Sequence, residues 1–152
     1  MIIGIISDTH GSLNRPAAEA LAGVDHIIHA GDVGAPDVIT ALEQIAPVTA
    51  VRGNTDGGYL AKKLPAVNMV TLAGITFYVL HDILVLDLDP VAAGVQVVVS
   101  GHTHRAEIRS TGAVLYLNPG SASQSRNGNG LSLARIDISQ DGLKPEIVDL
   151  KG

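Results

Sequence analysis

The main pattern in this sequence is a series of short apolar runs that end at glycine and polar residues. Residues 95–100 form one such run, rich in valine and bounded by Gly94 and Gly101. A run of this length and composition is typical of a buried strand. His102 and His104 follow it directly. Residues two apart point to the same side of an extended segment, so we expect both imidazoles to face the same way.

The histidine pair on its own leaves two interpretations open. Neutral imidazole is a common ligand of zinc, manganese, iron and nickel. Equally, one histidine could be packed in the core and the other exposed to solvent. The metal interpretation gains weight because polar side chains follow other apolar runs upstream.

The order of the predicted elements indicates an α/β fold. Strands alternate with helices in the N-terminal part of the chain, and the C-terminal part is mostly strands. In the N-terminal part we expect strands over residues 2–7, 26–30 and 48–51, a helix from Ser12 or Asn14 to Gly23, and a second helix from Pro36 that stops before Pro47. Later strands are expected over residues 69–72, 75–80, 95–100, 106–109, 114–117, 131–138 and 143–150, with a helical turn over 89–93. The last four strands are expected to be antiparallel.

The composition fits one globular domain over residues 1–152. Hydrophobic residues make up 46% of the chain and charged residues 16%, which is ordinary for a chain with a packed core. The net charge is −5 without a cluster of lysine and arginine, which argues against a nucleic-acid polymer as the partner. Aromatic residues, at 3%, are too few to form a platform for stacked bases.

The expected location is the cytoplasm. Cysteine is absent, and no basic leader precedes the first apolar run. No apolar run approaches the length of a membrane span, so no membrane partner is predicted.

Potential metal ligands follow five of the predicted strands. In sequence order they are Asp8 with His10, then Asp32, Asn54, His81, and His102 with His104. Sites in open α/β sheets lie beyond the carboxyl ends of the strands, which is where these side chains are expected. Packing alone does not explain so many agreeing placements, since buried polar residues are rare without partners.

The number of candidates indicates two metal ions rather than one. Seven side chains exceed what one tetrahedral or octahedral ion takes while leaving a position for water. Two ions about 3.5–4 Å apart that share one carboxylate use all of them. Asp8 and Asp32 do not balance the charge of two divalent ions, and the surplus suits a hydroxide and a phosphate oxygen.

These motifs, in this order, resemble the calcineurin-like metallophosphoesterase superfamily. The matching segments are Asp-x-His at 8–10, Gly-Asp at 31–32, Gly-Asn-x-Asp at 53–56, His81, Gly-His-x-His at 101–104 and Asn-Pro-Gly-Ser at 118–121. The sequence is most similar to the small single-domain prokaryotic phosphodiesterases of that superfamily. The resemblance implies a four-layer α/β/β/α sandwich of two packed mixed β-sheets.

The resemblance also implies a division of the ligands between two sites. One ion would be held by Asp8, His10, Asp32 and His104, and the other by Asp32, Asn54, His81 and His102. Asp32 would bridge the ions, and Asp32, Asn54 and His102 would form the catalytic centre, where a metal-bridging hydroxide attacks phosphorus in line. The cofactors would be two divalent transition-metal ions, manganese first, with nickel, iron or zinc as alternatives.

Two positions depart from the family pattern. Many members place a histidine after the Gly-Asn pair to protonate the leaving group, whereas this chain has Thr55. The small prokaryotic members also lack that histidine. The strand-terminal histidine is usually followed by glycine, whereas here Asp82 follows His81. Asp82 either adds negative charge near the second metal or points to solvent.

Several other polar residues admit two interpretations. Asp56 either orients a ligand amide or imidazole from behind or forms a turn. Arg52 and Arg126 can bind a phosphate bidentately, but a solvated surface position is favoured because surface arginine is common. His26 and His29 lie inside a strand and are interpreted as packed or surface residues rather than ligands.

Together these observations predict a dinuclear metal-dependent phosphoesterase that acts on a small phosphorylated substrate, with phosphodiesters favoured. A phosphomonoesterase is the first alternative. The alternative from another class is a non-catalytic protein-binding module on the same fold, and the complete ligand set favours the enzyme. The natural substrate, the metal used in the cell, any general acid and the formation of a homo-oligomer stay open.

Overall fold

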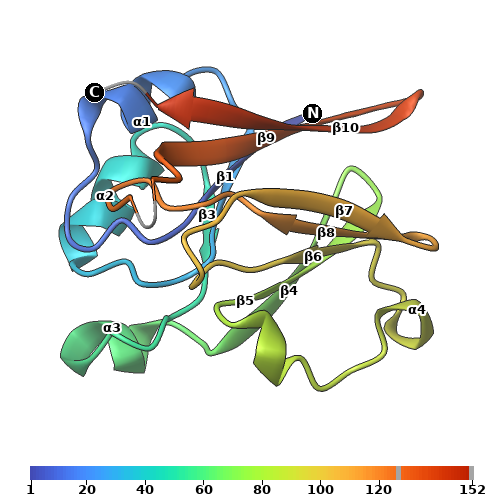
Figure 1. Ribbon diagram of the computed structural model, residues 1–152, viewed down its shortest axis with the longest axis horizontal. Helices are drawn as coiled ribbons and strands as arrows, with labels where there is room; N and C mark the ends of the chain where they lie inside the picture. The colour runs from blue at the N-terminus through green and yellow to red at the C-terminus, as the bar shows by residue number, and fades with distance from the viewer. Residues whose placement is uncertain (126–127, 151–152) are drawn as a thin grey trace.

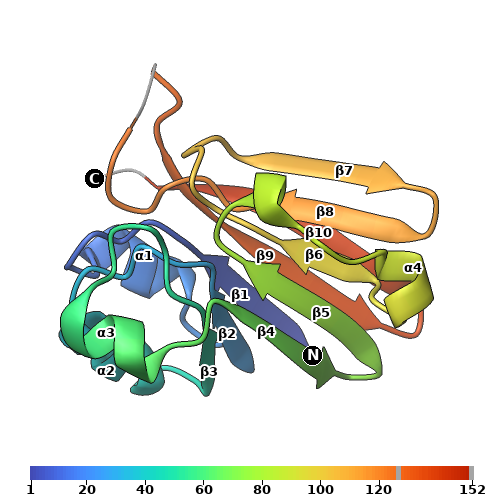
Figure 2. The same ribbon diagram turned by 90° about the horizontal axis from the view of Figure 1, so that it is seen from below.

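Two five-stranded β-sheets pack face to face in this structure, a computed structural model that describes residues 1–125 and 128–150 (Figures 1 and 2). The first sheet has the strand order β10-β9-β1-β2-β3. Its strands are β1 (Ile2–Ile6), β2 (His26–His29), β3 (Val48–Ala50), β9 (Leu131–Ser139) and β10 (Gly142–Leu150). β1, β2 and β3 are parallel, and β9 is antiparallel to β1 and β10, so the sheet is mixed.

The second sheet has the order β4-β5-β6-β8-β7. Its strands are β4 (Val67–Leu72), β5 (Ile75–Leu80), β6 (Val97–Val99), β7 (Glu107–Thr111) and β8 (Val114–Asn118). β8 is antiparallel to β7, as expected, but it is parallel to β6. The apolar β8 takes the inner position because it is largely buried, whereas the polar β7 is exposed at the edge.

Helices cover the outer faces of both sheets. They are α1 (Arg15–Ala20), α2 (Pro36–Glu43), α3 (Gly58–Lys63), the 3₁₀ turn η1 (Ile83–Val85) and α4 (Pro90–Ala93). α1, α2 and α3 pack their apolar side chains against the outer face of the first sheet. Figure 1 shows these three helices on one side of the molecule and α4 on the other. None of the helices in the described ranges is both long enough and apolar enough to cross a membrane. The predicted four-layer α/β/β/α architecture is confirmed, with a thin outer layer on the second sheet.

The alternation of side chains along the strands builds a core on each side of each sheet. Ile3 and Ile5 of β1 face the second sheet and meet Phe77 and Val79 of β5 in the layer between the sheets. Ile6 of the same strand packs on the opposite side, with the helices. Residues two apart share a face of a strand, so both faces must be apolar when both are covered.

The sequence did not predict α3 or η1. Gly57 and Gly58 favour a loop because glycine has a low helix propensity. α3 forms because Leu60 is buried in the core beside α2 and because Lys62 and Lys63 lie in its last turn, where cations are favourable. The strand expected over residues 95–100 is also shorter and covers only Val97–Val99.

The carboxyl ends of the parallel strands of both sheets meet at one edge of the molecule. After β1 and β2, the Asp8 amide donates to the Gly31 carbonyl at 3.0 Å. After β5 and β6, the Gly101 amide donates to the His81 carbonyl at 2.9 Å. The His102 amide joins the two sheets by donating to Asp8 Oδ2 at 3.1 Å. These bonds join four of the five predicted ligand segments, namely those after β1, β2, β5 and β6. The segment after β3 is not joined by them.

Candidate metal centre

Five predicted ligands adopt left-handed backbone conformations. The φ angles are 56° at Asp8, 48° at His10, 54° at Asp32, 73° at His102 and 60° at His104. Among the described residues only Ala73 shares a positive φ outside glycine. Such conformations cost energy and cluster at functional sites. The 101–104 segment is therefore turned, not extended as the sequence predicted, and its two imidazoles reach different partners.

Asp8 is fully buried, and its two carboxylate oxygens have different surroundings. Oδ2 accepts hydrogen bonds from the Ser7 hydroxyl at 2.7 Å and from the His102 amide at 3.1 Å. Oδ1 lies 3.2 Å from His104 Nε2, 3.7 Å from His10 Nε2 and 3.8 Å from His81 Nε2. One oxygen is held by the protein, and the other is directed at three imidazoles.

Asp32 has the same division between its oxygens. Oδ1 accepts from the Thr55 amide at 2.9 Å. Oδ2 lies 3.3 Å from His81 Nε2 and 3.8 Å from His10 Nε2. Burial alone would raise the pKa of the Asp32 carboxyl, but the His81 imidazole and the hydrogen bonds from Thr55 outweigh burial and hold the pKa well below its usual value. Asp32 is therefore an ionised carboxylate at neutral pH.

The orientation of His81 is fixed from behind. Its Nδ1–H donates to the Ala30 carbonyl at 2.7 Å, so Nε2 is the nitrogen that faces the carboxylates. Burial would lower the pKa of His81, but Asp32, the Ala30 carbonyl and Asp8 raise it above its usual value. A backbone carbonyl that holds one ring nitrogen is the usual arrangement behind a metal-binding histidine.

The donor atoms at the centre fit a metal ion. Within residues 1–125 and 128–150, Asp8 Oδ1, His10 Nε2 and His81 Nε2 are buried without a hydrogen-bond partner. Buried unsatisfied polar atoms are costly and rare. Two sets of three ligand atoms lie within 4.8 Å of one another, and they come from Asp8, His10 and His104, and from Asp8, Asp32 and His81. Carboxylates and imidazoles are ligands of divalent transition metals.

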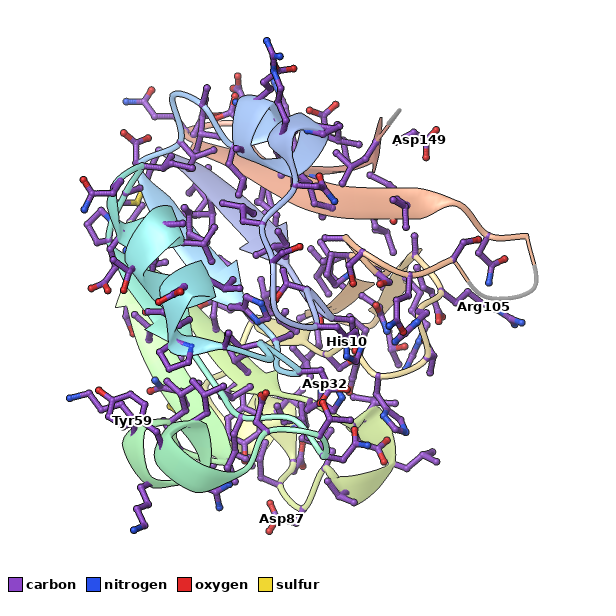
Figure 3. All side chains as sticks on the ribbon, turned by 90° about the vertical axis from the view of Figure 1, so that its left-hand side faces the viewer. His10, Asp32, Tyr59, Asp87, Arg105 and Asp149 are labelled. Carbon is purple, nitrogen blue, oxygen red and sulfur yellow. The ribbon has the colours of Figure 1, made fainter. Side chains whose placement is uncertain are left out.

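Both carboxylates lie between imidazoles, whereas the sequence singled out Asp32 as the shared ligand. Asp32 Oδ2 lies between His10 and His81, and Figure 3 shows His10 and Asp32 together at this edge of the molecule. Asp8 is the member that the two sets of ligand atoms have in common. Each carboxylate therefore directs one oxygen toward more than one imidazole.

Asn54 and His102 form a pair at the outer rim of the cluster. Asn54 is exposed, and His102 is partly exposed. His102 Nδ1 lies 3.1 Å from Asn54 Oδ1, and the His102 ring centroid lies 5.1 Å from that of His81. The structure thus brings all seven predicted ligands to one edge, with five in the buried cluster and two at its mouth.

A polar segment after β8 supports the cluster, and no role was predicted for it from the sequence. The Asn118 amide nitrogen donates to the Gly101 carbonyl at 2.9 Å and to the Thr103 hydroxyl at 3.1 Å. The Ser121 and Ser123 hydroxyls donate to the Asp8 carbonyl at 3.1 Å and 2.6 Å. The signal was present, because Asn118 is a polar residue that ends an apolar strand.

His29 lies behind the cluster and is fully buried, in agreement with its interpretation as a packed residue. Its Nδ1 accepts from the Gly31 amide at 3.1 Å, so Nε2 carries the proton. Nε2–H then donates to the Thr9 hydroxyl at 3.0 Å, and Thr9 donates to the Val33 carbonyl at 2.8 Å. This chain of hydrogen bonds joins the loop of Asp8 to the loop of Asp32. His26 is half-buried and bonds Thr49 instead.

Asp56 binds backbone amides in the described structure. Its carboxylate accepts from Val33 at 3.0 Å, from Gly34 at 2.9 Å and from Gly53 at 2.9 Å. It therefore makes the turn that one interpretation expected, and it also ties the loop after β3 to the loop after β2. None of its hydrogen bonds among the described residues reaches Asn54 or an imidazole.

Of the two arginines proposed for phosphate binding, the structure describes only Arg52. Arg52 Nη1 donates to the Leu64 carbonyl at 2.8 Å and to the Ala61 carbonyl at 3.5 Å, so this nitrogen is committed to α3. Arg126 lies outside the described residues. Asp82 Oδ1 accepts from the Leu84 amide at 3.0 Å and caps η1.

Two glycines are required by close approach to the carboxylates. A Cβ on Gly53 would collide with the Asp32 amide nitrogen and Oδ1. A Cβ on Gly101 would collide with the Ser7 hydroxyl and lie 2.8 Å from Asp8 Oδ2. Glycine at both positions lets the backbone approach the carboxylates that face the imidazoles.

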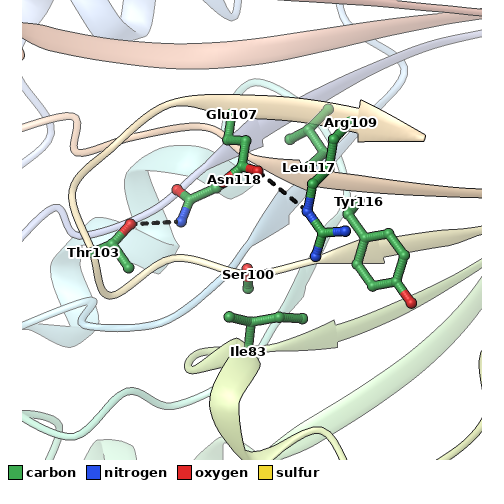
Figure 4. Close-up of a pocket in the computed structure, with 8 residues that line it drawn as sticks. All are labelled: Ile83, Ser100, Thr103, Glu107, Arg109, Tyr116, Leu117 and Asn118. Carbon is green, nitrogen blue, oxygen red and sulfur yellow. Dashed lines mark hydrogen bonds and ion pairs between the residues drawn. The ribbon is translucent and has the colours of Figure 1, made fainter. Parts of the chain in front are cut away.

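A small hollow lies beside the 101–104 segment on the outer side of the second sheet (Figure 4). Its volume is about 60 Å³, and its lining includes Thr103, Asn118 and Tyr116. Arg109 Nε lies 3.2 Å from Glu107 Oε1, and the guanidinium carbon lies 4.2 Å from the centroid of the Tyr116 ring. Arg109 is therefore held by its neighbours, and this hollow is separate from the ligand cluster.

The fold and the cluster define an α/β/β/α sandwich protein with a candidate metal site, and comparison with known proteins gives its family. The model of the calcineurin-like phosphoesterase superfamily domain matches residues 1–141. The chain belongs to this superfamily, so the resemblance seen in the motifs is confirmed.

Three similar proteins illustrate the relationship. A probable metallophosphoesterase of Methanothermobacter thermautotrophicus is 34% identical, and the match covers 90% of this chain and 87% of that protein. A phosphodiesterase of Methanocaldococcus jannaschii is 33% identical, and the match covers 79% of this chain and 83% of that protein. The crystal structure of Vps29 from Entamoeba histolytica complexed with zinc has a TM-score of 0.77 at 19% identity and covers 99% of this chain and all of that one. The last likeness shows the fold alone.

Proposed function

We propose that this chain is a metal-dependent phosphoesterase that hydrolyses small phosphodiesters with two divalent ions at the strand ends. The observation that carries the proposal is the group of buried, unsatisfied donor atoms on Asp8, His10 and His81 around the ionised Asp32. A cluster with only a structural role would satisfy such atoms with hydrogen bonds. Relatives named metallophosphoesterase and phosphodiesterase support the activity.

The seven ligands would divide into two sets that share Asp32. One ion would be held by Asp8, His10, Asp32 and His104, and the other by Asp32, Asn54, His81 and His102. When bound, divalent ions act as Lewis acids that lower the pKa of water and neutralise charge on phosphoryl oxygens. Manganese is the favoured ion, and nickel, iron and zinc accept the same types of ligand.

The protein prepares this site before the substrate arrives. Asp8 and Asp32 each have one oxygen fixed by hydrogen bonds, so the other oxygen is already oriented. The Ala30 carbonyl keeps the proton of a neutral His81 on Nδ1 and leaves Nε2 as the donor atom. Preorganised charges of this kind need no rearrangement during the reaction. Asn54 and His102 at the rim mark the side from which the phosphate would enter.

The charges around the cluster favour a diester over a monoester. A diester carries one negative charge at neutral pH, whereas a monoester approaches two and gains more from cationic side chains. Arg52 is turned toward the carbonyl groups of α3, and Asp82 adds a negative charge after His81. A monoester would gain from a cation at the cluster, but Arg52, which lines the neighbouring pocket, directs Nη1 at backbone carbonyls instead.

The candidate from another class is a non-catalytic protein-binding module. Vps29 has the same fold, so the fold alone does not separate the two functions. The ligand set favours the enzyme, because all seven positions hold a residue that can bind a metal.

Hydrolysis assays on metal-stripped protein test the proposal. We expect added manganese to restore hydrolysis of bis(4-nitrophenyl) phosphate, with a higher kcat/KM than for 4-nitrophenyl phosphate. Asp8→Asn should abolish the activity, and Asp37→Asn, an exposed change at the start of α2, should preserve it. Binding of manganese without hydrolysis of either ester would favour the binding module, and a higher kcat/KM for the monoester would reverse the substrate assignment.

A further inference from the structure

A pocket of about 260 Å³ opens beside the rim of the ligand cluster. Asn54, His81 and His102 line it on the side of the cluster. Val67, Leu80 and Val85 also line it and make much of its surface aliphatic. These three come from the start of β4, the end of β5 and η1, so the fold assembles the pocket from separate parts of the second sheet.

The aliphatic side chains of this pocket are exposed to water. Val67 is 44% exposed and Val85 is 67% exposed. Single exposed apolar residues are ordinary on a protein surface, but here they lie in one concave site that continues to the candidate metal ligands. Contact with an apolar group would remove this surface from water.

The charged residues in the lining are already bound to the backbone. Arg52 Nη1 donates to the Leu64 carbonyl at 2.8 Å, and Asp82 Oδ1 accepts from the Leu84 amide at 3.0 Å. One positive and one negative group balance each other in charge. The pocket therefore offers aliphatic contact without a net charge, which suits an uncharged organic group better than a second phosphate or a carboxylate.

We infer that this pocket binds the uncharged, apolar ester group of a phosphodiester whose phosphate lies at the cluster of Asp8, Asp32 and the histidines. The inference rests on the proposed function for the position of the phosphate. It specifies the substrate class as a diester with at least one apolar arm, such as an aryl group. The pocket borders the rim pair Asn54 and His102, so such an arm can reach it directly from a phosphate at the cluster.

A pair of ligands that differ in one arm tests the inference without depending on turnover. Methyl phenyl phosphate and dimethyl phosphate carry the same charge, but only the first has an aryl arm. We expect the zinc-loaded protein to bind methyl phenyl phosphate about tenfold more tightly, as partial burial of a phenyl ring predicts. In methyl-resolved NMR, this ligand should shift the Val67 and Val85 signals, and dimethyl phosphate should leave them nearly unchanged.

Two valines with nearly equal exposure, Val85 and Val91, provide matched variants. Val85→Asp places a charge in the pocket and should reduce the tenfold preference to less than about twofold. Val91 on α4 is 68% exposed, and it is not among the pocket residues. Val91→Asp should keep the full preference.

The outcomes separate the inference from the proposed function. Equal affinities for the two ligands, or shifts confined to methyl groups outside the pocket, would overturn the inference. Hydrolysis of diesters by the same protein would in that case leave the proposed function intact. Shifts at Val67 and Val85 without hydrolysis of any diester would support the pocket and contradict the enzyme.

Discussion

In the proposed site, Asp32 would connect the two halves through a single carboxylate. Asp32→Asn keeps an acceptor for the Thr55 amide but removes the charge between His10 and His81. We expect kcat/KM for a phosphodiester to fall by more than about 100-fold, with lower metal occupancy at both sites. Activity assays and elemental analysis of the variant check this.

His104→Ala is the comparison for Asp32→Asn. His104 faces Asp8 and belongs to only one of the proposed ligand sets. Its loss should therefore reduce the metal content mainly at one site. Equal occupancy losses in the two variants would contradict the special position of Asp32.

His29 gives the protein a stability that depends on pH. Burial lowers its pKa to about 4, although Asp56 opposes the shift. The unfolded chain, with an ordinary histidine pKa of about 6.5, binds a proton that the folded protein does not accept between these values. The contribution of His29 to the free energy of unfolding is therefore complete above that range. It falls by about 3 kcal/mol as the pH decreases through the range.

The variant His29→Asn tests this pH dependence. Asparagine can still accept from the Gly31 amide but cannot titrate. Denaturant unfolding of metal-free protein should show a shallower decline of the unfolding free energy between pH 6.5 and 4 than in the wild type. His26→Asn changes a partly exposed histidine of the same strand and should keep most of the decline. Parallel pH profiles for wild type and His29→Asn would exclude His29 as the cause.

The β4–β5 hairpin contains a strained turn. Leu72 pairs with Ile75, and the two residues between them, Ala73 and Gly74, have φ angles of 50° and 80°. Positive φ at both positions defines a type I′ turn, which asparagine followed by glycine favours. Alanine in this conformation costs about 1 kcal/mol.

Ala73→Asn should therefore raise the free energy of unfolding by about 1 kcal/mol, with a higher Tm. Thermal and denaturant unfolding measure the effect. Ala113→Asn is the control, because Ala113 is an exposed residue of the two-residue β7–β8 turn but does not have a positive φ, and it should not give this gain. A loss of stability in Ala73→Asn would show that the turn does not carry this strain.

The sequence indicated most strands because apolar runs and turn residues are local signals. Asn14 was also one of the two expected caps, and it accepts from the Ala17 amide at the start of α1. α3 was not predictable in this way, since its Gly57–Gly58 start opposes a helix and the burial of Leu60 depends on distant residues. The parallel pairing of β8 with β6 likewise depends on which strand of the hairpin is the more apolar.

Within residues 1–125 and 128–150, the candidate site lacks an evident acid for the leaving group. Thr55 occupies the position where many family members have a histidine, and its amide binds Asp32. A positioned acid typically contributes 10²–10⁴-fold, so its absence should be visible in the rates. We expect rates to depend steeply on leaving-group acidity, with nitrophenyl diesters far ahead of alkyl diesters.

A series of phosphodiesters with graded leaving-group pKa values measures this dependence. Arg126→Ala serves as the control for an arginine that assists departure, and we expect it to leave the slope unchanged. A flat dependence with chemistry shown to be rate-limiting would mean that the protein has a group that protonates the leaving group.

The identity of the seven candidate ligands followed from their positions at strand ends, because topology brings those ends to one edge. The donor atom that each ligand presents did not follow from the sequence. It depends on hydrogen bonds such as Thr55 to Asp32 and His81 to Ala30, which join segments far apart in the chain. The support from Asn118 and Ser121, and the pocket beside Val67 and Val85, also require three-dimensional contacts.

The number of divalent ions bound per chain tests the central claim most directly. Metal-stripped protein would be saturated with manganese, freed of excess ion by gel filtration and analysed for metal and protein content. The account predicts about two ions per chain, because seven ligands at one edge share a bridging carboxylate. One ion or none per chain at every manganese concentration would contradict it.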